Sequence, residues 1–403
     1  MNILLVAQFY PPCVGGVEIH AQQIAQEMNL EHCVQVVAGN FQPCGLSPRL
    51  NMLNTNLLAP SYASFDDKGV PVEALTPSSW DRLRMLPISV RAMPVLQRHA
   101  FHPLNRFGYQ WFRSVYKSRI RNLVSKADIV HTLGGNTYLE WTAVEAAKDK
   151  GIPCVCTPFV HPQQWGDGPD EIACYQKADA LVGLVPTDTG YLASLGFPPG
   201  KLHTIGVSPD LPPTADPEGF RRKHGLEGVP LVLYVGRMMP QKGAKAVLEA
   251  TSTVWKNAPE TRFVFIGPAS PAESAIFGEA DKRVLYLGKV SRQEKADALA
   301  ACDLFCMPSL SEILPTVYLE AWSFGKPVVG GQAHGLPELV EGNGAGFAVS
   351  QNPDEVAQAL LKLIQSPQLR SELGTKGKDM VEAKYSVSAV THSLLSLYQS
   401  LLA

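Results

Sequence analysis

The sequence predicts an α/β protein built from two doubly wound domains, each with a parallel sheet. Two blocks of the chain alternate apolar runs of strand length with amphipathic helical patterns, and a proline-rich link, SPDLPPTADPEG (208–219), separates the blocks. Repetition of strand, helix and strand implies a parallel sheet with helices on both faces. The chain of 403 residues is long enough for two such domains, each with its own core.

The first block opens with the apolar strand NILLVAQ (2–8), which is followed by a loop and by an amphipathic helix near Val17 to Met28. Its further predicted strands are CVQVVAG (33–39), ADIVHTL (127–133), IPCVCTPF (152–159) and ADALVGLV (178–185). We predict that residues 1–205 form the first domain.

The second block contains the predicted strands PLVLYVG (230–236), RFVFIG (262–267), RVLYLG (283–288), DLFCMP (303–308) and KPVVGG (326–331). We predict a second domain of residues 206–385 and a final helix, 386–403, that packs back on the first domain. Ligands of doubly wound sheets bind beyond the carboxyl ends of the strands. We therefore expect the active site in a cleft between two facing domains.

The composition is typical of a soluble globular protein and points to a cytoplasmic one. Apolar residues make up 45% of the chain and charged residues 18%, and the net charge of -2 gives no field that would attract nucleic acid. No uninterrupted apolar stretch is long enough for a membrane span, and the N-terminus lacks the basic region of a signal peptide. The eight cysteines have no zinc-ligand spacing, which indicates reduced thiols.

Two glutamates in the segment SEILPTVYLEAWSFGKPVV (311–329) indicate a ligand site. Pro315 suits the first turn of a helix that Gly325 ends, so Glu312 should lie on the entry loop and Glu320 about one turn into the helix. The free N–H groups and the dipole of a helix N-terminus bind phosphate. A ligand with an anionic middle and hydroxyls at both ends fits this arrangement, which favours a nucleoside-diphosphate sugar.

The alternative for these glutamates is a pair of solvated surface carboxylates, the usual position of Glu. Against it, Glu320 lies in the apolar stretch VYLEAW, where an unpaired charge would be unfavourable. We therefore expect Glu320 to have a buried partner.

Four segments in this order resemble the retaining glycosyltransferases of family 4. They are GGVE near the N-terminus, YVGRMMPQKG, the segment with the two glutamates, and GLPELVEG. The resemblance covers nearly the whole chain and implies the GT-B fold, in which two Rossmann-like domains face each other across a cleft. It implies an N-terminal acceptor domain and a C-terminal nucleotide-sugar donor domain. The chain departs from the family where it has EILP instead of EGFG and IGVS instead of NGVD.

The resemblance implies a role for each residue of the donor site. Glu320 would hold the ribose hydroxyls, and Glu312 would contact the donor sugar. The backbone at the helix start would meet the sugar and the diphosphate through Leu314, Pro315, Thr316 and Val317. The turn formed by Gly288, Lys289 and Val290 would border the nucleobase.

Gly236, Arg237 and Lys242 follow directly after the strand PLVLYVG, at its carboxyl end. Two fixed cations there can stabilise the charge of a departing nucleoside diphosphate. Because the chain contains no Asp-x-Asp metal-binding pair, we predict metal-independent chemistry and no cofactor. The alternative, two solvated charges at a helix start, is disfavoured because cations there oppose the helix dipole and because the family places phosphate-binding Arg and Lys at these positions.

Gly15 and Gly16 follow the first strand, but without GxGxxG they are no dinucleotide fingerprint. The resemblance implies a loop near the donor phosphates and the acceptor, whereas a plain turn is the alternative. His161, just beyond the strand IPCVCTPF, is predicted by the resemblance to lie close to the reacting sugar. His131 is its rival.

We expect Glu312, Lys242, Arg237 and His161 to act in catalysis. Family membership alone implies retention of configuration at the sugar. No residue is a compelling nucleophile, which favours a front-face substitution in which the departing phosphate helps to deprotonate the acceptor. A double displacement with Glu312 as nucleophile is the competing mechanism.

The segment 80–126 offers the one indication of the acceptor. It contains ten Arg or Lys against one acid, Asp81. Its interleaved aromatic residues are Trp80, Phe101, Phe107, Tyr109, Trp111, Phe112 and Tyr116. Two interpretations stay open. Either this surface binds an anionic membrane at its inner face and the acceptor is lipid-linked, or it is a solvated helical face whose aromatics pack on the sheet.

Two other classes of function also stay open. One is another GT-B enzyme, such as a sugar-nucleotide epimerase; a phosphorylase is disfavoured because the chain has no recognisable motif for a pyridoxal-phosphate lysine. The other is a non-catalytic subunit that binds a nucleotide-sugar. The intact set of Arg237, Lys242, Glu312 and Glu320 argues against such a silent copy.

Overall fold

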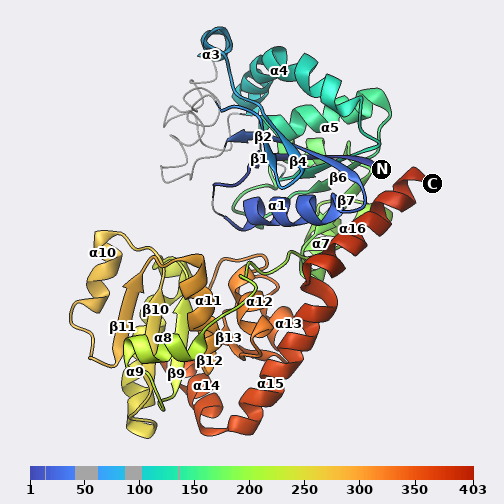
Figure 1. The fold of residues 1–403 in the computed structure, drawn as a ribbon. Coiled ribbons are helices and arrows are strands. Elements are labelled where there is room, and N and C mark those ends of the chain that lie inside the picture. The colour runs from blue at the N-terminus through green and yellow to red at the C-terminus, as the bar shows by residue number, and fades with distance from the viewer. Residues whose placement is uncertain (14, 41–61, 87–101, 135–136) are drawn as a thin grey trace. The chain divides into compact units, whose positions relative to one another are not determined.

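A computed structural model describes residues 1–13, 15–40, 62–86, 102–134 and 137–403 (Figure 1). The chain divides into two compact units. Unit 1 comprises Met1–Ile205 and Val390–Ala403, and unit 2 comprises Gly206–Ala389. Each unit contains one doubly wound sheet, in agreement with the predicted fold class.

Unit 1 has an eight-stranded sheet with the strand order β3-β4-β2-β1-β5-β6-β7-β8. The strands are β1 (Asn2–Phe9), β2 (Cys33–Asn40), β3 (Phe65–Asp67), β4 (Val70–Ala74), β5 (Ile129–Leu133), β6 (Cys154–Thr157), β7 (Ala180–Gly183) and β8 (Leu202–Thr204). The sheet is parallel, as predicted, except at one edge, where β3 pairs antiparallel with β4. Lys68 and Gly69 both have positive φ, +54° and +90°, which lets the chain reverse in a tight hairpin there.

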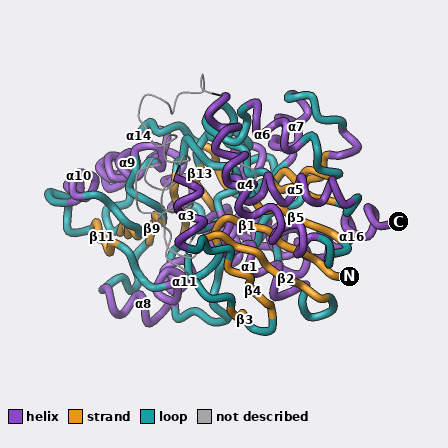
Figure 2. The backbone as a smooth tube through the Cα atoms, turned by 90° about the horizontal axis from the view of Figure 1, so that it is seen from above, coloured by secondary structure: helices purple, strands orange, loops and turns teal. Residues whose placement is uncertain are grey.

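The helices of unit 1 lie on both faces of its sheet (Figures 1 and 2). They are α1 (Gly16–Met28), α3 (Ser79–Met85), α4 (His102–Val124), α5 (Tyr138–Lys150), α6 (Pro169–Tyr175), α7 (Pro186–Ser194) and, from Val390 on, α16 (Val387–Leu402). Helices α4, α5 and α6 pack together on one face, and α1 lies on the other. None of the helices in the described ranges is long and apolar enough to cross a membrane.

The basic aromatic segment 80–126 divides into a buried and an exposed part. Tyr109, Phe112 and Tyr116 of α4 lie in the core of unit 1. These aromatics therefore pack against the sheet layer, as the second interpretation of the segment expects, and are not available to a membrane. Trp80 and Phe107, in contrast, are 73% and 47% exposed. Phe101 lies outside the described residues.

His131 of β5 is held in the core by contacts with α16 and β6. Its Nδ1 lies 2.6 Å from the hydroxyl of Tyr398, and its Nε2 lies 2.8 Å from the hydroxyl of Thr157. Burial, with a smaller contribution from His20, lowers the pKa of His131 to about 3. Both ring nitrogens of His131 therefore form hydrogen bonds inside unit 1, one to the terminal helix and one to the sheet. His131 thus serves the packing of the core.

This environment predicts a pH dependence of stability. A histidine whose pKa is depressed by folding stays neutral in the folded state, so its contribution is lost as the pH falls below its unfolded pKa of about 6.5. Replacing His131 with Gln should remove a slope of about 1.4 kcal/mol per pH unit in the free energy of unfolding between about pH 5.5 and 4. Urea unfolding at several pH values measures this slope.

The comparison of variant with parent isolates His131 from Glu140, whose burial raises its pKa to about 7 and gives the opposite slope. The same replacement at the partly exposed His32 is the control and should leave the slope unchanged. A His131→Gln protein with the parent's slope would contradict the prediction.

Unit 2 has a six-stranded sheet with the order β11-β10-β9-β12-β13-β14, and each neighbouring pair is parallel. The strands are β9 (Leu231–Val235), β10 (Arg262–Ile266), β11 (Val284–Gly288), β12 (Leu304–Met307), β13 (Val328–Gly330) and β14 (Gly346–Ala348). The α-helices are α8 (Pro217–His224), α9 (Ala244–Asn257), α10 (Pro271–Ser274), α11 (Arg292–Ala301), α12 (Thr316–Ser323), α13 (Leu336–Val340), α14 (Pro353–Gln365) and α15 (Pro367–Met380). The predicted second-block strands are all present; β9, β12 and β13 are apolar runs that are wholly buried, whereas the edge strand β11 is only partly buried.

Candidate active site

The two central strands of unit 2, β9 and β12, mark the point where the strand order reverses. They pair through Leu304 with Val232 and Phe305 with Leu233. The loop after β9 carries Arg237 and Lys242, and the loop after β12 carries Glu312. In doubly wound sheets, ligands bind beyond the carboxyl ends of the strands at such a switch point. The chain topology therefore brings these two loops to the same edge of the sheet, at the position where a ligand site is expected.

Lys242 and Glu312 contact each other at this site. The ammonium group of Lys242 forms an ion pair with the carboxylate of Glu312 and donates a hydrogen bond of 3.0 Å to the carbonyl of Ser311. The side chains are only 22% and 16% exposed, so water screens the pair less than it screens a surface pair. The sequence predicted both residues but not their contact.

Gly243 permits the close approach of the two loops. It follows the short 3-10 helix η5 (Pro240–Lys242) with φ +80°. A Cβ at this position would lie 2.7 Å from the carbonyl oxygen of Pro308, on the loop after β12. Both the positive φ and the close backbone require glycine here.

Arg237 is placed by its backbone. Its carbonyl accepts a 3.0 Å hydrogen bond from the hydroxyl of Tyr234, and the preceding Gly236 lies so close to Gly267 that a Cβ on Gly267 would be 1.9 Å from the Gly236 carbonyl oxygen. The side chain of Arg237 is exposed, and no ion pair holds its guanidinium within the part of the chain that the structure describes. Its charge is therefore available to an anion at the switch point.

Helix α12 begins one residue later than predicted. Pro315 is its N-cap, with φ -71° and ψ 111°, and not its first helical residue, because its ψ is extended and not helical. The side chain of the N-cap residue Pro315 makes no capping hydrogen bond, so the amides of Thr316 and Val317 are candidates for binding a ligand. Leu314, just before the cap, is buried.

Tyr318 fixes the start of α12 on the sheet. Its hydroxyl donates a 2.5 Å hydrogen bond to the carbonyl of Met307 and accepts one of 3.2 Å from the amide of Gly331. Because Tyr318 is fully buried, the first turn of α12 is held directly beyond β12 and β13. The helix N-terminus thus lies at the same strand ends as Lys242 and Glu312.

Glu320 is buried in α12 and has the partner that the sequence led us to expect. It is 2% exposed, and Nζ of Lys295 donates a 2.7 Å hydrogen bond to its Oε1. Burial raises the pKa of Glu320, and the positive charge of Lys295 opposes this shift. The sequence reasoning missed Lys295. The available signal was the position of Lys295 on the helix that directly follows the turn at Gly288, which was itself predicted to belong to the donor site.

The turn after β11 ends the strand at Gly288, which has φ +62°. Lys289 is exposed and Val290 is partly buried, and Ser291 then caps α11 by accepting a hydrogen bond of 3.1 Å from the amide of Glu294. The turn is thereby joined rigidly to the helix that carries the partner of Glu320.

Gly15, Gly16 and His161 belong to unit 1. Gly15 is the extended N-cap of α1, where a Cβ would lie 2.2 Å from a carboxylate oxygen of Glu18, and Gly16 is the first residue of the helix. They follow β1, which lies beside β5 at the switch point of the first sheet. His161 is half-buried, and its ring packs on that of Trp165 with the centroids 4.4 Å apart. Of the two rival histidines, only His161 lies outside the core.

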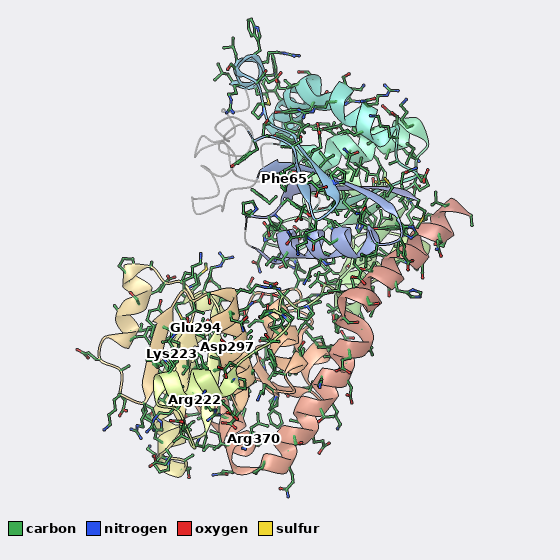
Figure 3. All side chains as sticks on the ribbon, in the orientation of Figure 1. Phe65, Arg222, Lys223, Glu294, Asp297 and Arg370 are labelled. Atoms are coloured by element: carbon green, nitrogen blue, oxygen red, sulfur yellow. The ribbon has the colours of Figure 1, made fainter. Side chains whose placement is uncertain are left out.

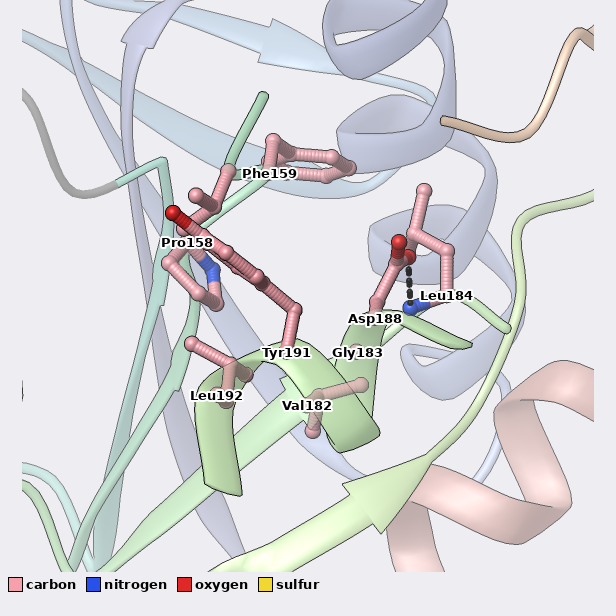
Figure 4. Close-up of a pocket in the computed structure, with 9 residues that line it drawn as sticks. Pro158, Phe159, Val182, Gly183, Leu184, Asp188, Tyr191 and Leu192 are labelled. Carbon is pink, nitrogen blue, oxygen red and sulfur yellow. Dashed lines mark hydrogen bonds between the residues drawn. The ribbon is translucent and has the colours of Figure 1, made fainter. Parts of the chain in front are cut away.

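A small pocket lies beyond β6 and β7, next to the loop of His161 (Figure 4). Phe159, Leu184, Asp188 and Tyr191 are among the residues that line it, and Asp188 accepts a 3.0 Å hydrogen bond from the amide of Leu184. Its volume of about 10 Å³ has room for roughly one water molecule. The pocket is therefore too small to bind a sugar ring.

Two family models match the chain. Residues 216–380 match the model described as glycosyl transferases group 1, and residues 15–207 match the glycosyl transferase 4-like domain. Together they cover most of both units.

Curated relatives match over part of the chain. It is 28% identical over 215 residues to the alpha-D-kanosaminyltransferase of Streptomyces kanamyceticus. The aligned region covers 51% of this chain and 56% of that protein. It is 27% identical over 195 residues to the GDP-mannose-dependent monoacylated alpha-(1-6)-phosphatidylinositol monomannoside mannosyltransferase of Corynebacterium glutamicum, 46% of this chain and 51% of that protein. The chain thus spans about half the length of these relatives.

Solved structures match over nearly the whole chain. The Anabaena protein HepE in complex with UDP has a TM-score of 0.71 at 18% identity, covering 99% of this chain and 100% of that one. The glycosyltransferase WaaG, involved in lipopolysaccharide biosynthesis, has a TM-score of 0.63 at 15% identity, covering 98% and 99%. The predicted GT-B fold class is confirmed by these likenesses.

Proposed function

We propose that this chain, whose residues 216–380 match the glycosyl transferases group 1, transfers a sugar from a nucleoside-diphosphate sugar to an acceptor hydroxyl. The contact of Lys242 with Glu312 at the switch point of unit 2 carries the proposal. It places a cation for phosphate next to a carboxylate for sugar hydroxyls, directly beyond the strand ends. A nucleotide-sugar joins these two chemistries in one ligand.

The donor would lie along three successive groups of unit 2. Glu320 accepts hydrogen bonds from the ribose, the amides of Thr316 and Val317 meet the diphosphate with Lys242 and Arg237, and Glu312 contacts the sugar. Charge develops on the diphosphate as the sugar leaves, and preorganised cations and amides stabilise it most in the transition state. We propose that these groups act without a metal and that no cofactor takes part.

For the chemical step we propose a front-face substitution with retention at the sugar. The acceptor oxygen bonds to the anomeric carbon, the bond from that carbon to the phosphate oxygen breaks, and the acceptor proton passes to the departing phosphate. The ion pair with Lys242 disfavours Glu312 as the nucleophile of a double displacement, because the cation stabilises the carboxylate charge that an attack would use. His161 stays a proposed hydrogen-bond donor or acceptor near the reacting sugar.

The acceptor is proposed to be lipid-linked and reached at the inner face of an anionic membrane. Helix α3 supports this, because Trp80, Leu83 and Leu86 at and beside it are 73%, 54% and 53% exposed, and the exposed Arg84 lies among them. Apolar side chains that enter the interface, next to cations that meet anionic headgroups, are typical of a peripheral membrane surface. One relative carries phosphatidylinositol in its name.

Replacing Trp80 and Leu83 together with Ser should weaken binding to anionic vesicles at least roughly tenfold, because burying each side chain stabilises the bound state by about 1.5–3 kcal/mol. Co-sedimentation with phosphatidylserine vesicles at low salt measures the binding. Leu30→Ser is the matched control, since Leu30 is 77% exposed in the same unit, and it should bind like the parent. A parent protein that does not sediment with the vesicles would end the membrane proposal.

A panel of UDP-, GDP- and ADP-sugars tests the function itself. The matching donor should raise the melting temperature, because a ligand that binds the folded state stabilises it by RT ln(1 + [L]/Kd), and slow release of the nucleoside diphosphate should follow. Stabilisation without release, with varied acceptors present, would favour a non-catalytic binding subunit. Conversion of the donor into its epimer would favour the epimerase.

A further inference from the structure

One oxygen of Glu320 is buried and has no hydrogen-bond partner among the described residues. Oε1 accepts a 2.7 Å hydrogen bond from the ammonium group of Lys295, whereas Oε2 accepts none from the described residues. Since Glu320 is only 2% exposed, bulk water does not readily replace the missing partner of Oε2. Leaving a buried acceptor unsatisfied is unfavourable, and more so for a charged group. A position that keeps such an oxygen open is suited to a hydrogen-bond donor that arrives with a ligand.

The helix that carries Lys295, α11, is held by two further contacts. Glu294, the neighbour of Lys295, forms an ion pair of 2.5 Å with Lys223 of α8, and Asp297 accepts a hydrogen bond of 2.8 Å from the amide of Asp216 (Figure 3). These contacts fix α11 against α8 and the link before it. The reach of Lys295 to Glu320 therefore does not depend on a flexible helix.

Lys295 is the cation that opposes the desolvation of Glu320. Burial raises the pKa of this carboxyl and Lys295 lowers it, while Asp210 acts in both directions, because its charge raises the pKa and its backbone amide lowers it. Arg292, one turn before Lys295 on the same helix, forms an ion pair of 2.6 Å with Asp210 and so neutralises this second carboxylate. One helix thus supplies a cation to each of the two acids, and Lys295 favours the ionised form of Glu320.

We propose that Lys295 is a positioning residue for the donor. It orients and charges Glu320 through Oε1, so that Oε2 accepts hydrogen bonds from the vicinal hydroxyls of the donor's ribose. Because α11 begins directly after the turn at Gly288–Val290, Lys295 also ties the turn predicted to border the nucleobase to the carboxylate that meets the ribose. This inference rests on the proposed function.

The test compares nucleotides with and without the hydroxyls. UDP, GDP and ADP are titrated calorimetrically into the parent, and the base that binds is then compared with its 2′,3′-dideoxy analogue. Lys295→Met removes the charge and keeps the length of the side chain, Lys295→Arg keeps the charge, and Glu320→Gln removes the acceptor charge itself. Circular dichroism verifies folding, and Lys295→Gln replaces the Met variant if that one does not fold.

We expect Lys295→Met to weaken binding of the ribonucleotide roughly tenfold or more, because hydrogen bonds from the ribose to a charged, correctly oriented carboxylate are among the strong ones. The dideoxy analogue should lose less than about threefold, and Lys295→Arg should recover most of the ribonucleotide affinity. In the Glu320→Gln background, Lys295→Met should have little further effect.

If Lys295→Met weakened binding of the ribonucleotide and of its dideoxy analogue equally, the inference would be overturned. The effect would then not depend on the ribose hydroxyls and could not act through Oε2 of Glu320. Unchanged ribonucleotide affinity in Lys295→Met would overturn it as well. Neither result touches the proposed function, which fails separately if the parent binds none of the nucleotides.

Discussion

Lys242→Met should lower kcat for sugar transfer roughly 100- to 1000-fold, the usual effect of removing one preorganised group that stabilises transition-state charge. The affinity for the nucleoside diphosphate should fall less, by under about tenfold, because charge on the leaving group grows as the sugar departs. The structure strengthens this expectation. The ammonium group of Lys242 is held by Glu312 and by the Ser311 carbonyl at the strand ends where the diphosphate is proposed to bind. Steady-state kinetics together with calorimetric titration of the nucleotide measure the two effects.

Lys245→Met is the matched control for this variant. Lys245 lies in the first turn of α9, 72% exposed, and meets only Glu249 in an i,i+4 pair at 3.6 Å, an arrangement that contributes little. Its kcat should stay within about twofold of the parent. If Lys242→Met weakened nucleotide binding and left kcat unchanged, Lys242 would be a general binding residue and its proposed role in the chemical step would be wrong.

The regular part of the fold could be predicted because burial on both faces turns a parallel strand into an apolar run. The run NILLVAQ lies within β1, and the run PLVLYVG contains β9. Both strands lie in the interior of their sheets. The edge strand β11 carries this signal in its run VLYLG, but two other edge strands do not. β3 reads FDD and is largely exposed, and β14 has only three residues. β4 had a usable signal, because its burial alternates at Val70, Val72 and Ala74.

The candidate site could be predicted residue by residue but not contact by contact. Lys242 and Glu312 stand 70 residues apart, and their contact follows from β9 lying beside β12, which is a property of strand order and not of either loop. Burial of Glu320 followed from its apolar neighbours, whereas its partner lies on another helix. The aromatics of α4 show the opposite case: a helix with charged and aromatic residues fits a membrane surface and a packed layer equally well, and only the position of the sheet separates them.

Glu312→Ala should lower turnover roughly 100- to 1000-fold and leave nucleotide affinity at or above that of the parent. In the proposed site, Glu312 meets the sugar, which a nucleoside diphosphate lacks, so the free nucleotide loses no contact. Removing the carboxylate also frees the charge of Lys242 for the phosphates, which favours the nucleotide. Turnover with the matching nucleotide-sugar and titration of its nucleotide measure both effects. Glu218→Ala, at a carboxylate that is 85% exposed on α8, is the control and should behave like the parent.

Unchanged turnover in Glu312→Ala would rule out its place in the donor site. The double variant Lys242→Met/Glu312→Ala separates a shared from an independent role, since residues in direct contact give losses that do not multiply. Because the two side chains form one ion pair, each single change also leaves the other charge partly buried and unpaired. The double variant should therefore lose clearly less than the product of the single losses. A full product would mean that the pair contributes to transfer through two separate contacts with the donor.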